Sequence, residues 1–177
     1  MLRRAVHRLL RFSGLHVERH RDAFADFAAA APSAKCVIDG GAYHGKASRQ
    51  FLRLFPSAEI HAFEPNPAHS HLFAGEPRIH LHQTAIAESN GEAAFYIPDK
   101  TFTASLLLPT NGKVDQTSVQ TVALDSLALR PEAIKLDLQG GELAAINREH
   151  RESLLRSQDV RLRFDRGKRR GKTGGEK

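Results

Sequence analysis

The sequence predicts an α/β fold of the Rossmann type, in which a mostly parallel sheet carries helices on both faces. The first observation is a strand–turn–helix unit. An apolar run closed by an acid covers residues 36–39, a glycine-rich turn follows over residues 40–45, and residues 46–55 place apolar side chains at helical spacing. The second observation is repetition, because residues 59–63 and 78–82 have the same strand pattern. Strands and helices that alternate at this spacing form right-handed crossovers and therefore a parallel sheet.

Composition narrows the classes of protein to which the chain can belong. Its single cysteine, Cys36, excludes a disulfide framework and favours a reducing compartment, so we expect a cytoplasmic protein. The net charge of +6 is concentrated after residue 146, where eight arginines and three lysines stand against five acids. The rest of the chain is neutral. We therefore attribute the pI of about 9.8 to the tail and expect no specific nucleic-acid partner.

The chain of 177 residues is long enough for one domain with two appendages. Residues 1–32 are expected to form a helical cap that ends at Pro32. Its first 12 residues are expected to form a basic amphipathic helix that packs at the domain edge, with weak contact to a membrane surface as the alternative. Residues 33–164 would form the main domain, and residues 165–177 a basic, disordered tail.

The middle of the chain departs from the alternating pattern. Asn90 and Gly91 are a strong turn signal, and the segments 93–97 and 118–122 are expected to pair as antiparallel strands at an edge of the sheet. The remaining predicted elements are a short helix at 67–73 capped by Asn66, a loop at 101–111 folding over a site, a strand at 133–138, a helix at 142–155 and a strand at 160–164.

Polar residues follow several of the predicted parallel strands, whose carboxyl ends meet at one crevice. Asp39 and the glycine turn follow the first strand, and Glu64 follows the second, 25 residues later, where an acid can accept both hydroxyls of a ribose. Lys135 and Asp137 stand at the end of a later strand. This combination predicts a nucleotide-like ligand.

The glycine turn favours S-adenosylmethionine over NAD. A dinucleotide fingerprint requires a glycine at the position of Ala42, and Asp39 would repel a diphosphate. The same carboxylate can bind the ammonium group of an amino-acid portion. The ligand's carboxylate would then lie at the helix N-terminus, its ribose at Glu64 and its adenine near Thr84. A NAD-binding oxidoreductase remains the alternative.

Five segments resemble the FkbM-type S-adenosylmethionine-dependent methyltransferases, in the order expected for that family. They are Val-Ile-Asp-Gly-Gly-Ala-x-x-Gly at 37–45, Ala-Phe-Glu-Pro-Asn-Pro at 62–67, Ala-Ser-Leu at 104–106, Thr-Val-Ala-Leu-Asp-Ser-Leu at 121–127 and Ile-Lys-Leu-Asp-Leu-Gln-Gly-Gly-Glu at 134–142. The resemblance implies a class I methyltransferase fold and O-methylation of a hydroxyl on a sugar, polyketide or other small metabolite.

Site residues follow from the resemblance position by position. It makes Lys135 and Asp137 the catalytic candidates, at the floor where cofactor and acceptor meet. Together with the predicted adenine contact, the cofactor-binding residues are Asp39, Gly40, Gly41, Ala42, Gly45, Glu64 and Thr84.

The sequence departs from the family pattern at Tyr43, where asparagine is usual, and at Gly141, where alanine or tyrosine is usual. Family members continue through further strands, whereas this chain becomes basic and stops, so we expect the closing strands to be missing. A truncated or degenerate methyltransferase domain that turns nothing over is therefore a second hypothesis.

Methyl transfer from a sulfonium is an in-line displacement, for which a protein mainly supplies alignment and a dry pocket. Asp137 is the candidate general base, followed by His44, although Asp137 equally suits a role in ordering the cofactor. No cysteine cluster accompanies the ten histidines, so we expect no metal site.

Overall fold

The computed structural model describes residues 23–98, 104–109, 112–145 and 162–164. Several predicted segments lie outside the described residues, namely the helix over residues 1–12, most of the helix over 142–155 and the basic tail. Predictions about those segments stay predictions. Among the described helices, none is both long and apolar enough to cross a membrane.

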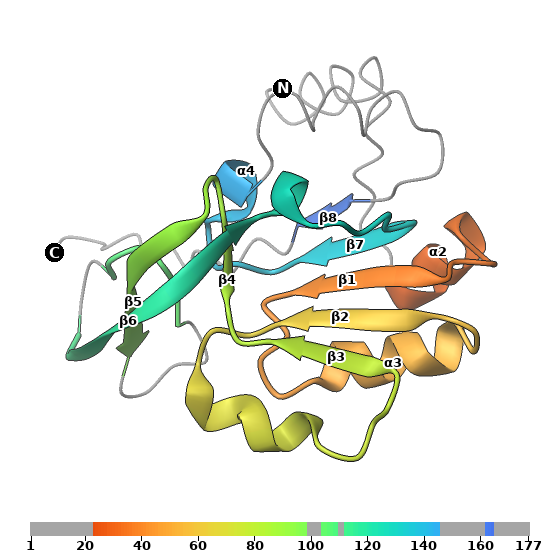
Figure 1. Cartoon of the computed structure of the whole chain (residues 1–177), viewed down its shortest axis with the longest axis horizontal. Helices are drawn as coiled ribbons and strands as arrows, with labels where there is room; N and C mark the ends of the chain where they lie inside the picture. Colours follow the sequence, from red (N-terminus) through yellow and green to blue (C-terminus); the bar gives the residue numbers. More distant parts are fainter. Residues whose placement is uncertain (1–22, 99–103, 110–111, 146–161, 165–177) are drawn as a thin grey trace, which may run out of the picture.

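The main sheet confirms the predicted α/β class. Its five strands are all parallel and lie in the order β3-β2-β1-β7-β8 (Figure 1). Their bounds are Cys36–Gly40 for β1, Glu59–Phe63 for β2, Ile79–His82 for β3, Ala133–Leu136 for β7 and Leu162–Phe164 for β8. The predicted strand over 133–138 is two residues too long, because the chain turns at Asp137.

Alternation along the strands sends side chains into two apolar layers. Val37 and Ile60 belong to the layer beneath α2 (Ala23–Ala30), α3 (Lys46–Leu54) and the 3₁₀ helix η1 (Pro67–Phe73). Ile38 and Ile134 belong to the opposite layer, beneath α4 (Glu142–Ala145) and the 3₁₀ helix η2 (Leu124–Ser126). Both sheet faces are therefore covered, as the near-continuous apolar strands predict.

A second sheet lies beyond the carboxyl ends of the main strands, where the arrowheads point in Figure 1. It contains β4 (Ala85–Ala87), β5 (Gly91–Pro98) and β6 (Val114–Ala123), in the order β4-β6-β5. The predicted antiparallel pairing of the segments 93–97 and 118–122 is confirmed. Their placement at an edge of the main sheet is wrong, because β6 pairs instead with β4, a strand too short to give a sequence pattern.

The turn signal at Asn90 and Gly91 marks the connection from β4 to β5, not the connection between the antiparallel partners. Asn90 has a tertiary role there. Its Oδ1 accepts hydrogen bonds from the Ala123 backbone N–H and the Ser126 hydroxyl, both at 2.8 Å. The turn therefore ties the second sheet to η2.

Candidate functional site

The carboxyl ends of β1, β2 and β7 lie side by side, as the sequence predicts. In the registers of the two pairings, Gly40 lies opposite Phe63 on one side and Leu136 on the other. The Phe63 carbonyl accepts hydrogen bonds from the N–H groups of Gly41 and Ala42, each at 3.0 Å. The Asp137 N–H donates to the Gly40 carbonyl at 3.0 Å. The glycine turn is thus bound to both neighbouring strand ends.

The glycines of this turn are required by the packing of the chain itself. Gly41 has φ 70°, and a Cβ atom there would lie 2.0 Å from the Asp137 carbonyl oxygen. Gly45 has φ 68°, and its Cβ would meet Arg49 and Phe73 at under 3.0 Å. From the sequence, these glycines are expected to leave room for the close approach of a ligand. In the structure, protein atoms lie at those positions.

Asp39 is fully buried beneath the turn, and its carboxylate has partners within the protein. The Ser48 hydroxyl on α3 donates to Oδ2 at 2.6 Å. The Lys135 ammonium donates to Oδ1 at 2.8 Å and to the carbonyls of Gly40 at 3.3 Å and Gly41 at 3.0 Å. This arrangement differs from the expected contact of Asp39 with a ligand ammonium. It also shows that the Lys135 ammonium, with its side chain 13% exposed, already has three acceptors.

Glu64 joins the second strand end to the same turn. Its Oε2 accepts from the Tyr43 N–H at 2.8 Å, and its Oε1 accepts from the Asn66 N–H at 3.0 Å. His69 Nδ1 lies 3.3 Å from Oε1 but forms no hydrogen bond with any described residue. The contact between His69 and Glu64 is therefore one of proximity only. Each carboxylate oxygen still has one lone pair with no hydrogen bond in the described structure.

Aromatic rings cover the Glu64 side of the turn. Tyr43, with φ 50°, stacks on His44 with ring centroids 3.7 Å apart. The His69 ring is perpendicular to both, with ring centroids at 4.8 and 4.9 Å.

Thr84 follows β3 at the same edge of the sheet. Its Oγ1 is buried and has no hydrogen-bond partner among the described residues. A buried hydroxyl without a partner is costly, so a polar ligand atom at this position would be stabilising. The predicted adenine contact therefore coincides with an unsatisfied polar atom.

A second turn follows β7, and it is held by its own helix. Glu142, in the first turn of α4, accepts from the Leu138 N–H at 2.9 Å and from the Gly140 N–H at 3.1 and 3.2 Å. Gln139 has φ 56° and Gly140 φ 108°. The Gln139 amide donates to Asp137 Oδ1 at 3.1 Å, so the candidate base is oriented by a side chain of this turn. Sequence reasoning missed Glu142, although an acid in the first turn of a helix is a signal for such capping.

The described part of the predicted covering loop, residues 104–109, contacts this second turn. Ser105 pairs with Tyr96 of β5, and its hydroxyl lies 3.4 Å from the Leu138 carbonyl. The chain then presents Leu107 and Leu108, which are 52% and 68% exposed. The loop therefore places an apolar surface beside the second turn.

The remaining candidates for metal binding or acid–base chemistry are the histidines, the cysteine and the other acids. Among the described residues, no group of three or more histidines, cysteines and acids could hold a metal ion. Burial and the nearby Glu132 carboxylate raise the pKa of Cys36, at the start of β1. Burial and neighbouring imidazoles lower the pKa of His61 and His82, which are hydrogen-bonded to one another at 3.0 Å.

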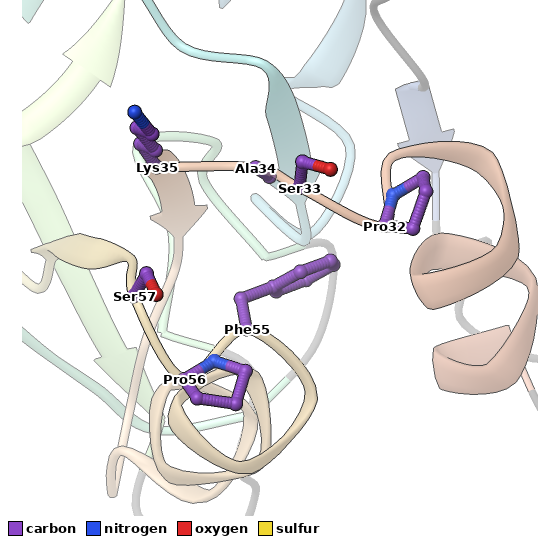
Figure 2. A pocket seen from close by; sticks show the side chains of 7 residues that line it. All are labelled: Pro32, Ser33, Ala34, Lys35, Phe55, Pro56 and Ser57. Carbon is purple, nitrogen blue, oxygen red and sulfur yellow. The ribbon is translucent and has the colours of Figure 1, made fainter.

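Figure 2 shows a hollow near the amino-terminal ends of β1 and β2, with a volume of about 280 Å³. Residues that precede β1 and β2 line it, namely Pro32, Ser33, Ala34, Lys35, Phe55, Pro56 and Ser57. None of the predicted site residues is among them. In open α/β sheets, ligands bind outside the carboxyl ends of the strands, so we do not place the functional site in this hollow.

Comparison with known proteins places the chain in a family. A family model described as the methyltransferase FkbM domain matches residues 39–170, which begin at the acid before the glycine turn. A crystal structure of the methyltransferase FkbM from Methylobacillus flagellatus KT aligns at 17% identity with a TM-score of 0.44, covering 65% of this chain and 28% of that one. The comparison with curated proteins returned no match. Because the family model covers well over half of the sequence, the resemblance is confirmed, and the chain belongs to the FkbM methyltransferase domain family.

Proposed function

We propose that the chain is an S-adenosylmethionine-dependent O-methyltransferase that acts on a hydroxyl of a sugar or another small metabolite. The observation that carries this proposal is the position of Glu64, whose carboxylate is buried at the end of β2 beside the glycine turn. A ribose offers two adjacent hydroxyl donors, and each oxygen of Glu64 retains accepting capacity for one of them.

The neighbouring groups suit the other parts of such a cofactor. Thr84 provides a buried hydroxyl for the adenine. The N-terminus of α3 has no side-chain cap, since Gly45 occupies that position, and it favours a carboxylate. When bound, the cofactor supplies an electrophilic methyl group on a sulfonium. The protein's own contribution would then be to align this group with the acceptor and to exclude water.

Asp137 is the residue best placed to receive the acceptor's proton. It follows β7 directly, its backbone contacts the glycine turn, and the Gln139 amide orients its carboxylate. Lys135 is poorly suited to that task, because its ammonium is held by Asp39 and two carbonyls. Of the two catalytic candidates, we therefore retain Asp137 as the base.

Calorimetry on the purified chain tests the cofactor assignment. S-adenosylhomocysteine should bind and NAD should not. Tighter binding of NAD than of either adenosyl ligand would contradict the proposal and favour the oxidoreductase alternative. Release of S-adenosylhomocysteine from S-adenosylmethionine in the presence of sugar acceptors then tests turnover. Binding without any transfer would favour the hypothesis of a domain that has lost activity.

A further inference from the structure

We propose that Lys135 and Asp39 are a positioning pair that fixes the glycine turn, and that Asp39 does not hold the amino group of the cofactor. The inference rests on the proposed function, because it concerns how that cofactor is held. It also replaces the catalytic role that the sequence predicts for Lys135 with a role through the backbone of the turn.

The contacts of Lys135 point to this role. One ammonium group bonds the Asp39 carboxylate of β1 and the carbonyls of Gly40 and Gly41, over distances of 2.8 to 3.3 Å. These three acceptors belong to successive residues at the point where β1 becomes the turn. A three-donor ammonium bonded to three acceptors is saturated, so it fixes the direction in which the chain leaves the strand.

The Asp39 carboxylate is also held from the side of α3. Its second oxygen accepts the Ser48 hydroxyl of α3 at 2.6 Å, so the carboxylate connects β7, β1 and the helix that follows the turn. Ser48 is buried on the apolar face of that helix. The pair therefore sets the position of the strand end, the turn and the helix N-terminus together.

Electrostatics argue against a ligand ammonium at the same carboxylate. Asp39 is 0% exposed, and a buried charge needs a close and well-bonded partner, which Lys135 already provides. A second cation at Asp39 would have to approach the Lys135 ammonium, and like charges in a buried site repel strongly. The amino-acid portion of the cofactor must therefore find its acceptors elsewhere.

The consequence is a distinctive pattern of ligand affinities. A residue that contacts the ammonium affects only ligands that carry one. A pair that positions the turn affects every ligand that lies against the turn, through the position of the Gly41 and Ala42 amides and of Glu64, which is bonded to Tyr43. Comparing S-adenosylhomocysteine with 5′-methylthioadenosine separates the two roles, because the latter shares the adenosine and thioether but lacks the amino-acid portion.

The experiment measures the Kd of both ligands by calorimetry for the wild type and for Asp39→Asn, Lys135→Met, Lys135→Arg and the double variant Asp39→Asn/Lys135→Met. Measurements are made well below each thermal midpoint, so that all of the protein is folded. The double variant removes both charges and leaves neither buried alone, which preserves the test if a single variant does not fold. We expect the Asp39→Asn and double variants to weaken both ligands by about tenfold and by the same factor. Lys135→Arg should recover part of the affinity lost in Lys135→Met.

Two results would overturn the inference. A loss at Asp39→Asn that is at least about tenfold larger for S-adenosylhomocysteine than for 5′-methylthioadenosine would assign the ammonium to Asp39. Unchanged affinities in the folded double variant would reduce the pair to a purely structural role. If the wild type binds neither ligand, the proposed function fails first and the inference fails with it, a result that differs from all the others.

Discussion

The two strand–turn–helix units of the site are built from similar residues but are held in different ways. The turn after β1 is fixed by groups far away in the sequence, namely the Lys135 ammonium, the Phe63 carbonyl and the Glu64 carboxylate. The turn after β7 is fixed by Glu142, which lies two residues beyond Gly140. The position of the first turn therefore depends on contacts with neighbouring strands, whereas the second turn is held mainly by a residue close to it in the sequence.

This difference assigns separate tasks to the two turns. A turn that receives bonds from two neighbouring strands keeps a fixed position relative to Glu64 and Thr84, and this suits the binding of a large cofactor. The second turn is held mainly by Glu142 of its own helix, with one further contact from the Ser105 hydroxyl to the Leu138 carbonyl. Mutations in the first turn should accordingly disturb the sheet, and mutations in the second should have more local effects.

The largest expected effect is that of Gly41→Ala. A side chain there requires a left-handed φ, and its Cβ would lie 2.0 Å from the Asp137 carbonyl. Backbone strain and overpacking together should lower the free energy of unfolding by at least about 3 kcal/mol, measured by urea denaturation. The loss of stability would arise where the first turn packs against Asp137, the residue that follows β7.

Gly141→Ala is the matched control in the second turn. A Cβ at Gly141 would make ordinary contacts with Leu138 at 3.5 Å, so stability should change by no more than about 1 kcal/mol. Equal destabilisation by the two substitutions would show that the first turn is no more constrained than the second.

A smaller effect on stability is expected when either of the two carboxylates that hold the turns is replaced, and the two replacements should differ in their effect on ligand affinity. Glu64→Gln and Glu142→Gln each leave a backbone N–H facing an amide in place of a carboxylate oxygen, so each should cost about 1–2 kcal/mol of stability. Only Glu64→Gln should also weaken S-adenosylhomocysteine, by about ten- to a hundredfold, because charge-assisted bonds to the ribose are lost.

Calorimetry and urea denaturation on the two variants provide the comparison. Unchanged affinity in folded Glu64→Gln would limit Glu64 to supporting the turn. An equal loss of affinity in Glu142→Gln would instead bring the second turn into the cofactor site.

The smallest effect concerns pH and arises at the hydrogen-bonded pair His61 and His82 on β2 and β3. Burial lowers the folded-state pKa of His61 and His82 below the ordinary value of 6.5. As pH falls below 6.5, the unfolded chain therefore takes up protons before the folded chain does, and stability decreases until the lowered folded-state pKa is passed. The thermal midpoint should thus be lower at pH 5 than at pH 7.5.

The double variant His61→Gln/His82→Gln should reduce this pH dependence, whereas His71→Gln, on the exposed side of η1, should leave it unchanged. His80 and Glu59 face the same pair and bond one another at 2.7 Å, so they should be kept in both variants. An unaltered pH slope in the double variant would assign the dependence to other groups.

Elements in which local chemistry and burial agree could be predicted from the sequence. The apolar run of β1, the exact bounds of β2 and the capping of η1 by Asn66 over Pro67 follow from patterns within a few residues. The same patterns brought Asp39, Glu64 and Asp137 to one edge, because parallel strands share the direction of their carboxyl ends. The family motifs depend on these residues, so the family could be predicted as well.

Which charges are neutralised by partners within the protein could not be predicted from the sequence. Asp39 and Lys135 are 96 positions apart, and no periodicity says that one neutralises the other. The sequence therefore left Asp39 open to a ligand. The separate second sheet was likewise beyond prediction, because the three residues of β4 are too few to show a period and take their strand form from pairing with β6. The physical reason is the same in both cases: a contact between distant segments depends on how the sheet brings them together, and a local pattern records only which face a residue occupies.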